Sequence, residues 1–159
     1  MTHDLSPDVK RALISASITA QTGITEAMID ILVRDFYDQI RKDPLLGPIF
    51  TNRIKDWEPH LSQMVGFWSS VILMSGRYHG NPMAKHKDLA VDSTHFTRWL
   101  LLFEKSLRKI CPPEAQAYFM DRARRIAQSL SMGIADMQAE AAAVPVFVKS
   151  GLVKTGVRP

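Results

Sequence analysis

The sequence predicts an all-α protein with a single domain. Apolar residues recur at intervals of three and four along most of the chain, which is the spacing of one face of a helix. No segment shows the alternation of apolar and polar residues that marks a half-buried strand, and no internal repeat stands out. A chain of 159 residues buries roughly two thirds of the surface that it exposes when unfolded, so it can enclose a cofactor as well as a core.

The first two expected helices differ in how pronounced their apolar faces are. Ser6, Pro7 and Asp8 are typical of a helix start, and the weakly apolar helix that follows ends near Gly23. The next helix begins at Thr25 and ends at Asp43-Pro44, because a residue before proline disfavours helical geometry. Two adjacent apolar stripes run along it, made of Met28, Leu32, Phe36 and Ile40 and of Ile29, Val33 and Tyr37. This wide face predicts a buried Tyr37.

A compact apolar corner at residues 45–50 precedes the third expected helix, for which Asp56 is the predicted cap. The apolar stripe of this helix consists of Trp57, His60, Leu61, Met64, Phe67, Trp68, Val71 and Ile72. His60 therefore faces the same way as the aromatic residues. Glycine and proline at residues 76–82 then indicate a loop, which leaves room for only a short helix around residues 83–89.

Two further long helices complete the pattern. Ser93 or Thr94 is expected to cap a helix that carries Trp99 inward and stops at the prolines 112–113, and the last helix runs from about residue 113 to 137. A proline and two glycines beyond residue 143 predict a loosely ordered tail. We therefore expect an N-terminal helical extension at 1–23, one domain at 24–139 and a basic tail at 140–159.

Composition and charge exclude several classes of function. The chain is 46% apolar and 23% charged, as ordinary globular proteins are. Its net charge of +4 is uneven, since residues 141–159 hold three basic residues and no acid, and the remainder holds 17 basic and 16 acidic residues. Three scattered cations do not make the clustered patch that nucleic acid binding requires, so we expect no nucleic acid partner.

The cysteine content and the N-terminus favour a cytoplasmic location. Cys111 is the single cysteine and cannot form an internal disulfide, which fits a reducing compartment. The chain does not open with a charged segment followed by an apolar one, and no window reaches the roughly 18 apolar residues of a membrane span.

Histidine is the commonest metal ligand among protein side chains, so each histidine is a candidate site residue. Of the five histidines, one lies near the N-terminus and one in a glycine loop, which leaves His60, His86 and His95 as candidates. The neighbours of His86 are both lysines, so local sequence alone favours an exposed side chain there. His95 has a similar interpretation near the start of a helix. Taken singly, Tyr37 and the three tryptophans are also better explained as core residues.

Seven segments in order change this assessment: Phe36-Tyr37, Asp43-x-x-Leu46-Gly47-Pro48-Ile49-Phe50, Trp57-x-x-His60, Phe67-Trp68, Gly76-x-Tyr78-x-Gly80-x-Pro82, Lys85-His86-x-Asp88-Leu89 and Trp99-Leu100-x-Leu102-Phe103. Their order and spacing resemble those of the group III truncated haemoglobins, over about residues 24–137. The resemblance implies a truncated globin fold, in which a two-over-two helical sandwich surrounds haem b and its iron.

The resemblance also implies roles for individual residues. His86 corresponds to the proximal iron ligand, and Tyr37, His60 and Trp99 correspond to polar groups on the distal side, where the gas ligand binds. The expected haem walls are Phe36, Phe50, Met64, Phe67 and Trp68. Met64 replaces a branched aliphatic residue that is usual at its position. The candidates for the haem propionates are Lys85, Tyr78, Arg77 and Arg98, any of which is equally explained as a surface group.

The implied function is binding of O₂, NO, CO and similar small ligands, with peroxide or cyanide as further ligands. Hydrogen bonds from Tyr37 and Trp99 to a negatively polarised ligand are worth about 1.5–3 kcal/mol each, which predicts slow O₂ release. Oxidation of NO to nitrate is the expected reaction, peroxidase-like turnover is the first alternative, and gas binding or sensing without turnover is the second. Either reaction needs an external reductase. A cofactor-free helical bundle with a docking tail is the remaining alternative.

Overall fold

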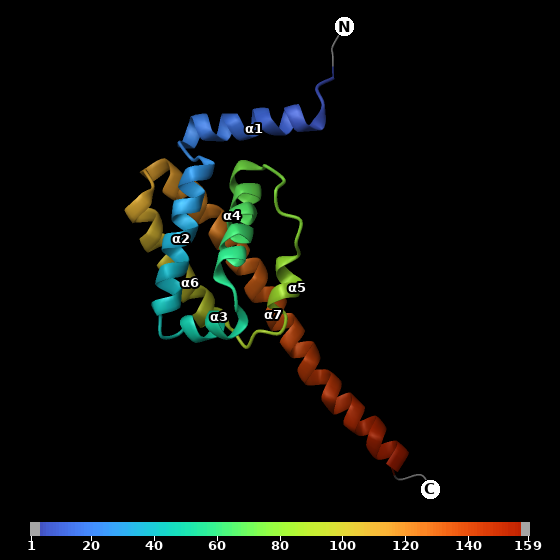
Figure 1. Ribbon diagram of the computed structural model, residues 1–159. Helices are drawn as coiled ribbons and strands as arrows, with labels where there is room; N and C mark the ends of the chain where they lie inside the picture. The colour runs from blue at the N-terminus through green and yellow to red at the C-terminus, as the bar shows by residue number, and fades with distance from the viewer. Residues whose placement is uncertain (1–3, 157–159) are drawn as a thin grey trace.

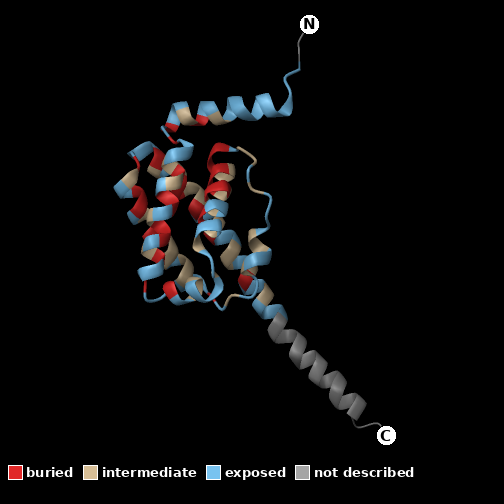
Figure 2. Ribbon diagram, viewed as in Figure 1, coloured by how far each residue is buried: buried red, intermediate tan, exposed pale blue. Residues whose placement is uncertain are grey.

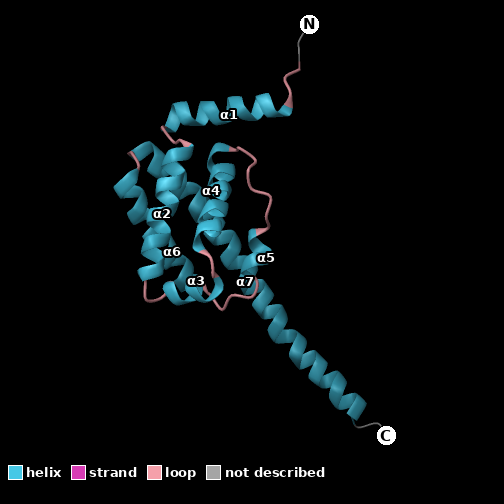
Figure 3. Cartoon of the chain, in the orientation of Figure 1, coloured by secondary structure: helices cyan, strands magenta, loops and turns pink. Residues whose placement is uncertain are grey.

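The computed structural model describes the backbone of residues 4–156 and the side chains of residues 4–140, and Figure 1 shows its arrangement. The described part is built from helices and loops alone (Figure 3). The helices are α1 (Pro7–Thr22), α2 (Glu26–Lys42), α3 (Gly47–Arg53), α4 (Trp57–Leu73), α5 (Pro82–His86), α6 (Ser93–Ile110) and α7 (Pro113–Gly156). The all-α prediction is confirmed. None of the described helices is long and apolar enough to cross a bilayer.

Four helices form a two-over-two sandwich. Helix α2 packs against α4 and α6 packs against α7, while α2 also contacts α6 and α4 also contacts α7. Buried residues concentrate where these four helices face one another (Figure 2). The core is rich in aromatic and branched side chains, and its largest fully buried members include Trp68, Phe36, Phe103 and Phe119.

Helix α1 lies across one end of the sandwich, as Figure 1 shows. Ser6 accepts a hydrogen bond from the Val9 amide at 3.3 Å, and Gly23 ends the helix at φ +75°, so both expected ends are observed. The far half of the helix has little contact with the body, and three of its apolar side chains are exposed: Val9, Leu13 and Ile14. The expected helical extension at 1–23 is therefore present over the described residues.

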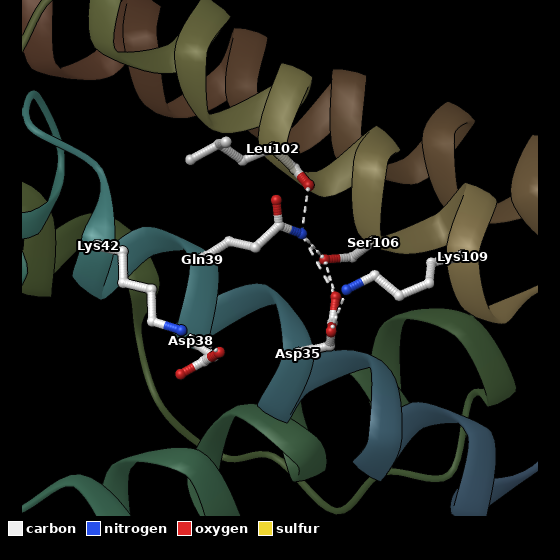
Figure 4. Close-up of polar contacts among 7 residues, drawn as sticks. All are labelled: Asp35, Asp38, Gln39, Lys42, Leu102, Ser106 and Lys109. Carbon is white, nitrogen blue, oxygen red and sulfur yellow. Dashed lines mark hydrogen bonds and ion pairs between the residues drawn. The ribbon is translucent and has the colours of Figure 1, made fainter.

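A polar cluster sets how α6 lies on α2 (Figure 4). Ser106 and Lys109 of α6 both donate to Asp35 of α2, each at 2.7 Å, and Gln39 also reaches Ser106. Burial alone would raise the pKa of Asp35, but the hydrogen bonds from Lys109 and Ser106 outweigh it and the pKa is lowered. The charged carboxylate thus fixes the register between the two helices, and with it the position of Trp99 relative to α2.

The turn after α2 is held by a buried ion pair. The Asp43 side chain is almost fully buried and contacts Arg98 of α6 at 2.6 Å. Its second oxygen accepts hydrogen bonds from the amides of Leu45 and Leu46. This carboxylate therefore joins the end of α2, the start of α3 and the middle of α6.

Four details differ from the sequence-based expectations. The expected apolar corner at residues 45–50 leads into a short helix, α3, which starts at Gly47, where a Cβ would lie only 2.9 Å from the Arg41 carbonyl oxygen. The cap of α6 is Asp92 rather than Ser93 or Thr94, and Asp56 makes no capping hydrogen bond at α4. The backbone of α7 is helical to Gly156, where a loose tail was expected, since proline and glycine weaken a helix without forbidding its dihedral angles.

Candidate functional site

A cavity of about 470 Å³ opens within the sandwich, and its size lies in the range of small-molecule and cofactor sites. Side chains from α2 to α7 line it, and most of them are apolar. The residues predicted for the site that line it are Tyr37, Phe50, His60, Met64, Phe67, Trp68, Tyr78, Lys85, His86 and Trp99. Ten residues that are spread over 63 positions of sequence thus meet at one cavity.

Phe36 is the predicted wall residue that the structure does not bring to the cavity. Its ring is 1% exposed and packs against Phe103 at 4.9 Å and Trp99 at 5.5 Å between ring centres. Successive residues of a helix point about 100° apart. Tyr37 therefore faces the cavity while its neighbour Phe36 faces α6.

Tyr37 and His60 form the polar end of the cavity. Their rings meet edge to face at 5.2 Å, and Trp57 packs against both, with ring centres 5.8 Å from His60 and 6.1 Å from Tyr37. Trp57 does not line the cavity and instead lies under the Arg41 guanidinium, 4.5 Å from its ring centre. Burial raises the pKa of Tyr37, so its hydroxyl keeps its proton at neutral pH and remains a hydrogen-bond donor.

His60 carries an unsatisfied ring nitrogen. Its Nε2 is buried and is the only such side-chain atom without a hydrogen-bond partner among the described residues. Buried polar atoms are nearly always paired in folded proteins, so this nitrogen calls for a partner in the cavity. Burial, and then the charge of Lys85, lower the pKa of His60. The imidazole is therefore neutral at pH 7 and can either accept or donate a proton.

Trp99 is held in a stack of aromatic rings. It lies almost parallel to Phe103, with an interplanar angle of 6° and ring centres 5.7 Å apart, and Trp68 stacks on Phe103 at 4.8 Å. Trp68 and Trp99 both line the cavity, whereas Phe103 is fully buried behind them. The stack gives the cavity flat, rigid aromatic walls.

His86 reaches the cavity from the short helix α5. Its Nδ1 lies 2.6 Å from the Pro82 carbonyl oxygen, which can only accept, so Nδ1 carries the hydrogen and donates. The other nitrogen, Nε2, then has an available lone pair. A backbone carbonyl that fixes the tautomer in this way is the usual support of a histidine metal ligand. The local expectation of a fully exposed side chain is not met, since His86 is partly buried and lines the cavity.

His95 also lines the cavity, and its ring is tied to the start of α6. The Asp92 amide donates to His95 Nδ1 at 3.1 Å as part of the capping box of α6. The same nitrogen lies 3.2 Å from Asp92 Oδ1, a carboxylate oxygen that only accepts, so these two contacts assign no single tautomer to the ring. Of these two histidines, only His86 has a hydrogen-bond partner that leaves its Nε2 lone pair available.

The cations near the cavity differ in their interaction partners. Lys85 lies at the cavity, with its Nζ 5.8 Å from the centre of the Tyr78 ring. Arg77 pairs with Glu26 at 2.7 Å and Arg98 pairs with Asp43, so neither lines the cavity. Arg53 does line it and had not been predicted, because it belongs to the unexpected helix α3.

These residues fit the haem that the sequence resemblance implies. The His86 imidazole offers Nε2 as a ligand atom, flat aromatic rings line the space, the polar atom His60 Nε2 lacks a partner, and the cations Lys85 and Arg53 line the cavity. Among the described residues, no group of three His, Cys, Asp or Glu side chains could hold a metal ion alone. A single histidine ligand is the arrangement expected when a macrocycle supplies the others.

Comparison with known proteins supports this view. Residues 19–131 match the family model described as bacterial-like globin. The chain is 38% identical over 109 residues to the group 3 truncated hemoglobin ctb of Campylobacter jejuni, with 65% of this chain and 86% of that protein covered.

Two solved structures share the fold. The crystal structure of a group III truncated haemoglobin from Campylobacter jejuni aligns with a TM-score of 0.67 and 35% identity, covering 70% of this chain and 91% of that one. A group II truncated haemoglobin from Bacillus anthracis aligns with a TM-score of 0.60 over 71% of this chain and 88% of that one, and at 23% identity it supports the fold alone.

Proposed function

The chain belongs to the bacterial-like globin family as a group III truncated haemoglobin, and on this premise we propose that it holds haem b through His86 and uses O₂ to oxidise NO. Family membership supports haem-based binding of small ligands. One observation supports the proposed NO oxidation: Tyr37 and His60, whose Nε2 has no partner, line the same cavity as His86, whose Nε2 is the proposed iron ligand.

When bound, haem supplies an iron centre that takes up a diatomic ligand and exchanges electrons with it. His86 holds this centre in place, because its Nδ1–H is tied to the Pro82 carbonyl oxygen and its Nε2 is the remaining nitrogen. Lys85, Tyr78 and Arg53 line the cavity and would supply cations and donors to the carboxylates of the cofactor. The aromatic walls exclude water and so strengthen each hydrogen bond inside.

Tyr37 and Trp99 are the proposed donors to the ligand. Tyr37 stays protonated because burial raises its pKa, and packing against both Phe103 and Trp68 limits the orientations of the Trp99 indole. A hydrogen bond to a negatively polarised acceptor is worth about 1.5–3 kcal/mol. Two donors retain O₂, which suits a protein that must hold it until NO arrives. The turnover then needs an electron donor from outside the chain.

Peroxidase-like turnover is a second candidate, and His60 favours it. A neutral imidazole with an unpaired buried nitrogen can take a proton from a peroxide and return it to the leaving oxygen. The same nitrogen also serves as a third donor to a gas ligand. The two candidates therefore differ in which co-substrate the bound form consumes.

Three measurements on the haem-loaded protein separate these functions. A Soret band after addition of haem supports the cofactor, and its absence contradicts the proposal outright. Stopped-flow replacement of O₂ by CO gives the O₂ release rate, and mixing the oxygenated protein with NO gives the rate of nitrate formation. Slow O₂ release without NO consumption leaves ligand binding or sensing as the function. Peroxide-dependent oxidation of a dye, lost in His60→Leu, identifies the second candidate.

A further inference from the structure

Helix α5 cannot be held by its own burial. It has five residues and none of them is buried, although it carries the nitrogen that would bind iron. Loops at residues 74–81 and 87–92 flank it on both sides. Its position must therefore come from contacts made by other helices.

The first contact is a hollow in α7 at Gly133. A Cβ at this position would overlap the terminal methyl of Met83 and lie 2.7 Å from its sulfur. Met83 lies on α5, three residues before His86 and hence near it on the helix surface. Because residue 133 has no side chain, the Met83 thioether rests directly against α7.

Three hydrogen bonds hold the chain around His86. Gln138 of α7 donates from Nε2 to the carbonyl oxygens of Val91 at 3.3 Å and Leu89 at 3.5 Å, both after His86. Arg53 of α3 donates from Nη2 to the Lys85 carbonyl oxygen at 2.9 Å, one residue before His86. The ligand segment is thus attached to two separate helices, α3 and α7.

We propose that Gly133, Gln138 and Arg53 are positioning residues for His86, because together they fix where α5 stands and hence where its imidazole points. None of the three residues was identified from the sequence. The inference rests on the proposed function, in which His86 is the iron ligand. The Pro82 carbonyl oxygen sets the tautomer and rotation of the ring within α5, while these three residues set the place of α5 itself.

The test uses Gly133→Ala in the haem-loaded protein. The added methyl displaces Met83, so we expect a shifted or broadened iron–histidine stretching band in the resonance Raman spectrum of the ferrous, unliganded form. We also expect haem transfer to an excess of a haem-scavenging apoprotein to be about tenfold faster, the low end for loss of a ligand support. Alanine favours a helix more than glycine does, so the unfolding midpoint should not fall. A purely structural role would not give this combination.

Rescue and controls complete the design. In a Met83→Ala background the overlap is gone, so Gly133→Ala should cause no further change in the band or in haem transfer. Gln138→Glu keeps the size of the side chain but loses its donor, so it should speed haem transfer severalfold. Arg53→Leu removes the contact from α3 and also a cation that lines the cavity, so its readout is a shifted or broadened iron–histidine band and not haem transfer. Met132→Ala changes the exposed neighbour of Gly133 and should have no effect.

Failure of this inference is distinguishable from failure of the proposed function. If His86→Gly removes the wild-type band but the band and transfer rate of Gly133→Ala and Gln138→Glu and the band of Arg53→Leu equal those of the wild type, the positioning role is overturned and the ligand assignment stands. If His86→Gly leaves the spectra of the wild type unchanged, the ligand assignment fails and the inference fails with it.

Discussion

The two sides of the cavity are built from different kinds of structure. Tyr37 and His60 belong to α2 and α4, helices of 17 residues each that bury six and seven residues in the core. His86 belongs to a helix of five residues with no buried member. Core packing therefore places Tyr37 and His60, the proposed distal groups, whereas a few separate contacts place His86, the proposed proximal ligand. Rigidity on one side and adjustability on the other would suit the proposed site, which retains a gas ligand and tunes an iron.

The largest expected effect in this comparison is on the proximal side. His86→Gly removes the nitrogen that would bind iron, so haem retention should fall by about 100-fold or more, the upper range for loss of a metal support. Absorption spectra and haem transfer measure this, and added imidazole should restore the ferrous spectrum. His79→Gly, an exposed residue in the neighbouring loop, is the matched control. Spectra that persist in His86→Gly and vanish in a His95 variant would transfer the ligand role to His95.

The next effect belongs to the distal side. Tyr37→Phe removes one hydroxyl without changing the packing, so O₂ release should be about 10 to 150 times faster, which corresponds to about 1.5–3 kcal/mol. Haem content should be unchanged, and that separates this variant from His86→Gly. Tyr118→Phe, which removes a hydroxyl from a tyrosine outside the cavity, should leave the rate unaltered. An unchanged rate in Tyr37→Phe would assign the donor role to Trp99 or His60.

The stabilisation from the buried Asp43–Arg98 ion pair should depend on pH. Burial would raise the pKa of Asp43, but the Arg98 hydrogen bond and the amides of Leu46 and Leu45 outweigh it and lower the pKa. The stabilisation is thus fully present above the unfolded value of about 4 and is lost as the pH falls through the folded value. We expect Asp43→Ala to lower the free energy of unfolding by about 2 kcal/mol at pH 7, less than for a fully buried pair because Arg98 is partly exposed.

Denaturant titrations at pH 7 and pH 3 test this expectation. The difference between Asp43→Ala and the wild type should shrink at the lower pH. Asp38→Ala breaks the exposed pair with Lys42 and should cost less than about 0.5 kcal/mol at either pH. Equal losses for the two variants would mean that burial adds nothing to the Asp43 pair.

The smallest effect lies at the end of α4. Met74 ends this helix in the left-handed conformation at φ +56° and is exposed. Glycine adopts this conformation without steric cost, so Met74→Gly should raise the free energy of unfolding by about 0.5–1 kcal/mol. Thermal unfolding of the haem-loaded protein measures the change, and Met132→Gly, in the interior of α7, should have the opposite sign. A loss of stability in Met74→Gly would show that its side chain contributes more than the strain costs.

The sequence predicts the distal side better than the proximal side, for a physical reason. The positions of Tyr37, His60 and Trp99 follow from long amphipathic helices, in which every turn repeats the same signal. His86 has no such pattern, and its local neighbours indicate an exposed residue. Only the resemblance to a family identified it as a ligand.

The residues that the sequence does not reveal act through contacts between distant segments. Gly133 has a role because Met83 arrives from another helix, and Gln138 because two backbone carbonyls lie within its reach. Arg53 escaped notice because α3 itself was not predicted. Phe36 was assigned to the haem wall, and the rotation between neighbouring helix positions explains why it packs on α6 instead.

That rotation also limits which genetic changes α2 can accept. Phe36 packs in the core and Tyr37 lines the cavity, although the two residues are adjacent in α2. A point mutation at codon 37 changes the chemistry of the cavity and leaves the core intact. Insertion or deletion of a single codon between Thr25 and Phe36 turns everything beyond it by about 100°, so it removes the hydroxyl from the cavity and the phenyl ring from the core together. Variation among descendants of this gene should therefore reach this segment through substitutions and not through length changes.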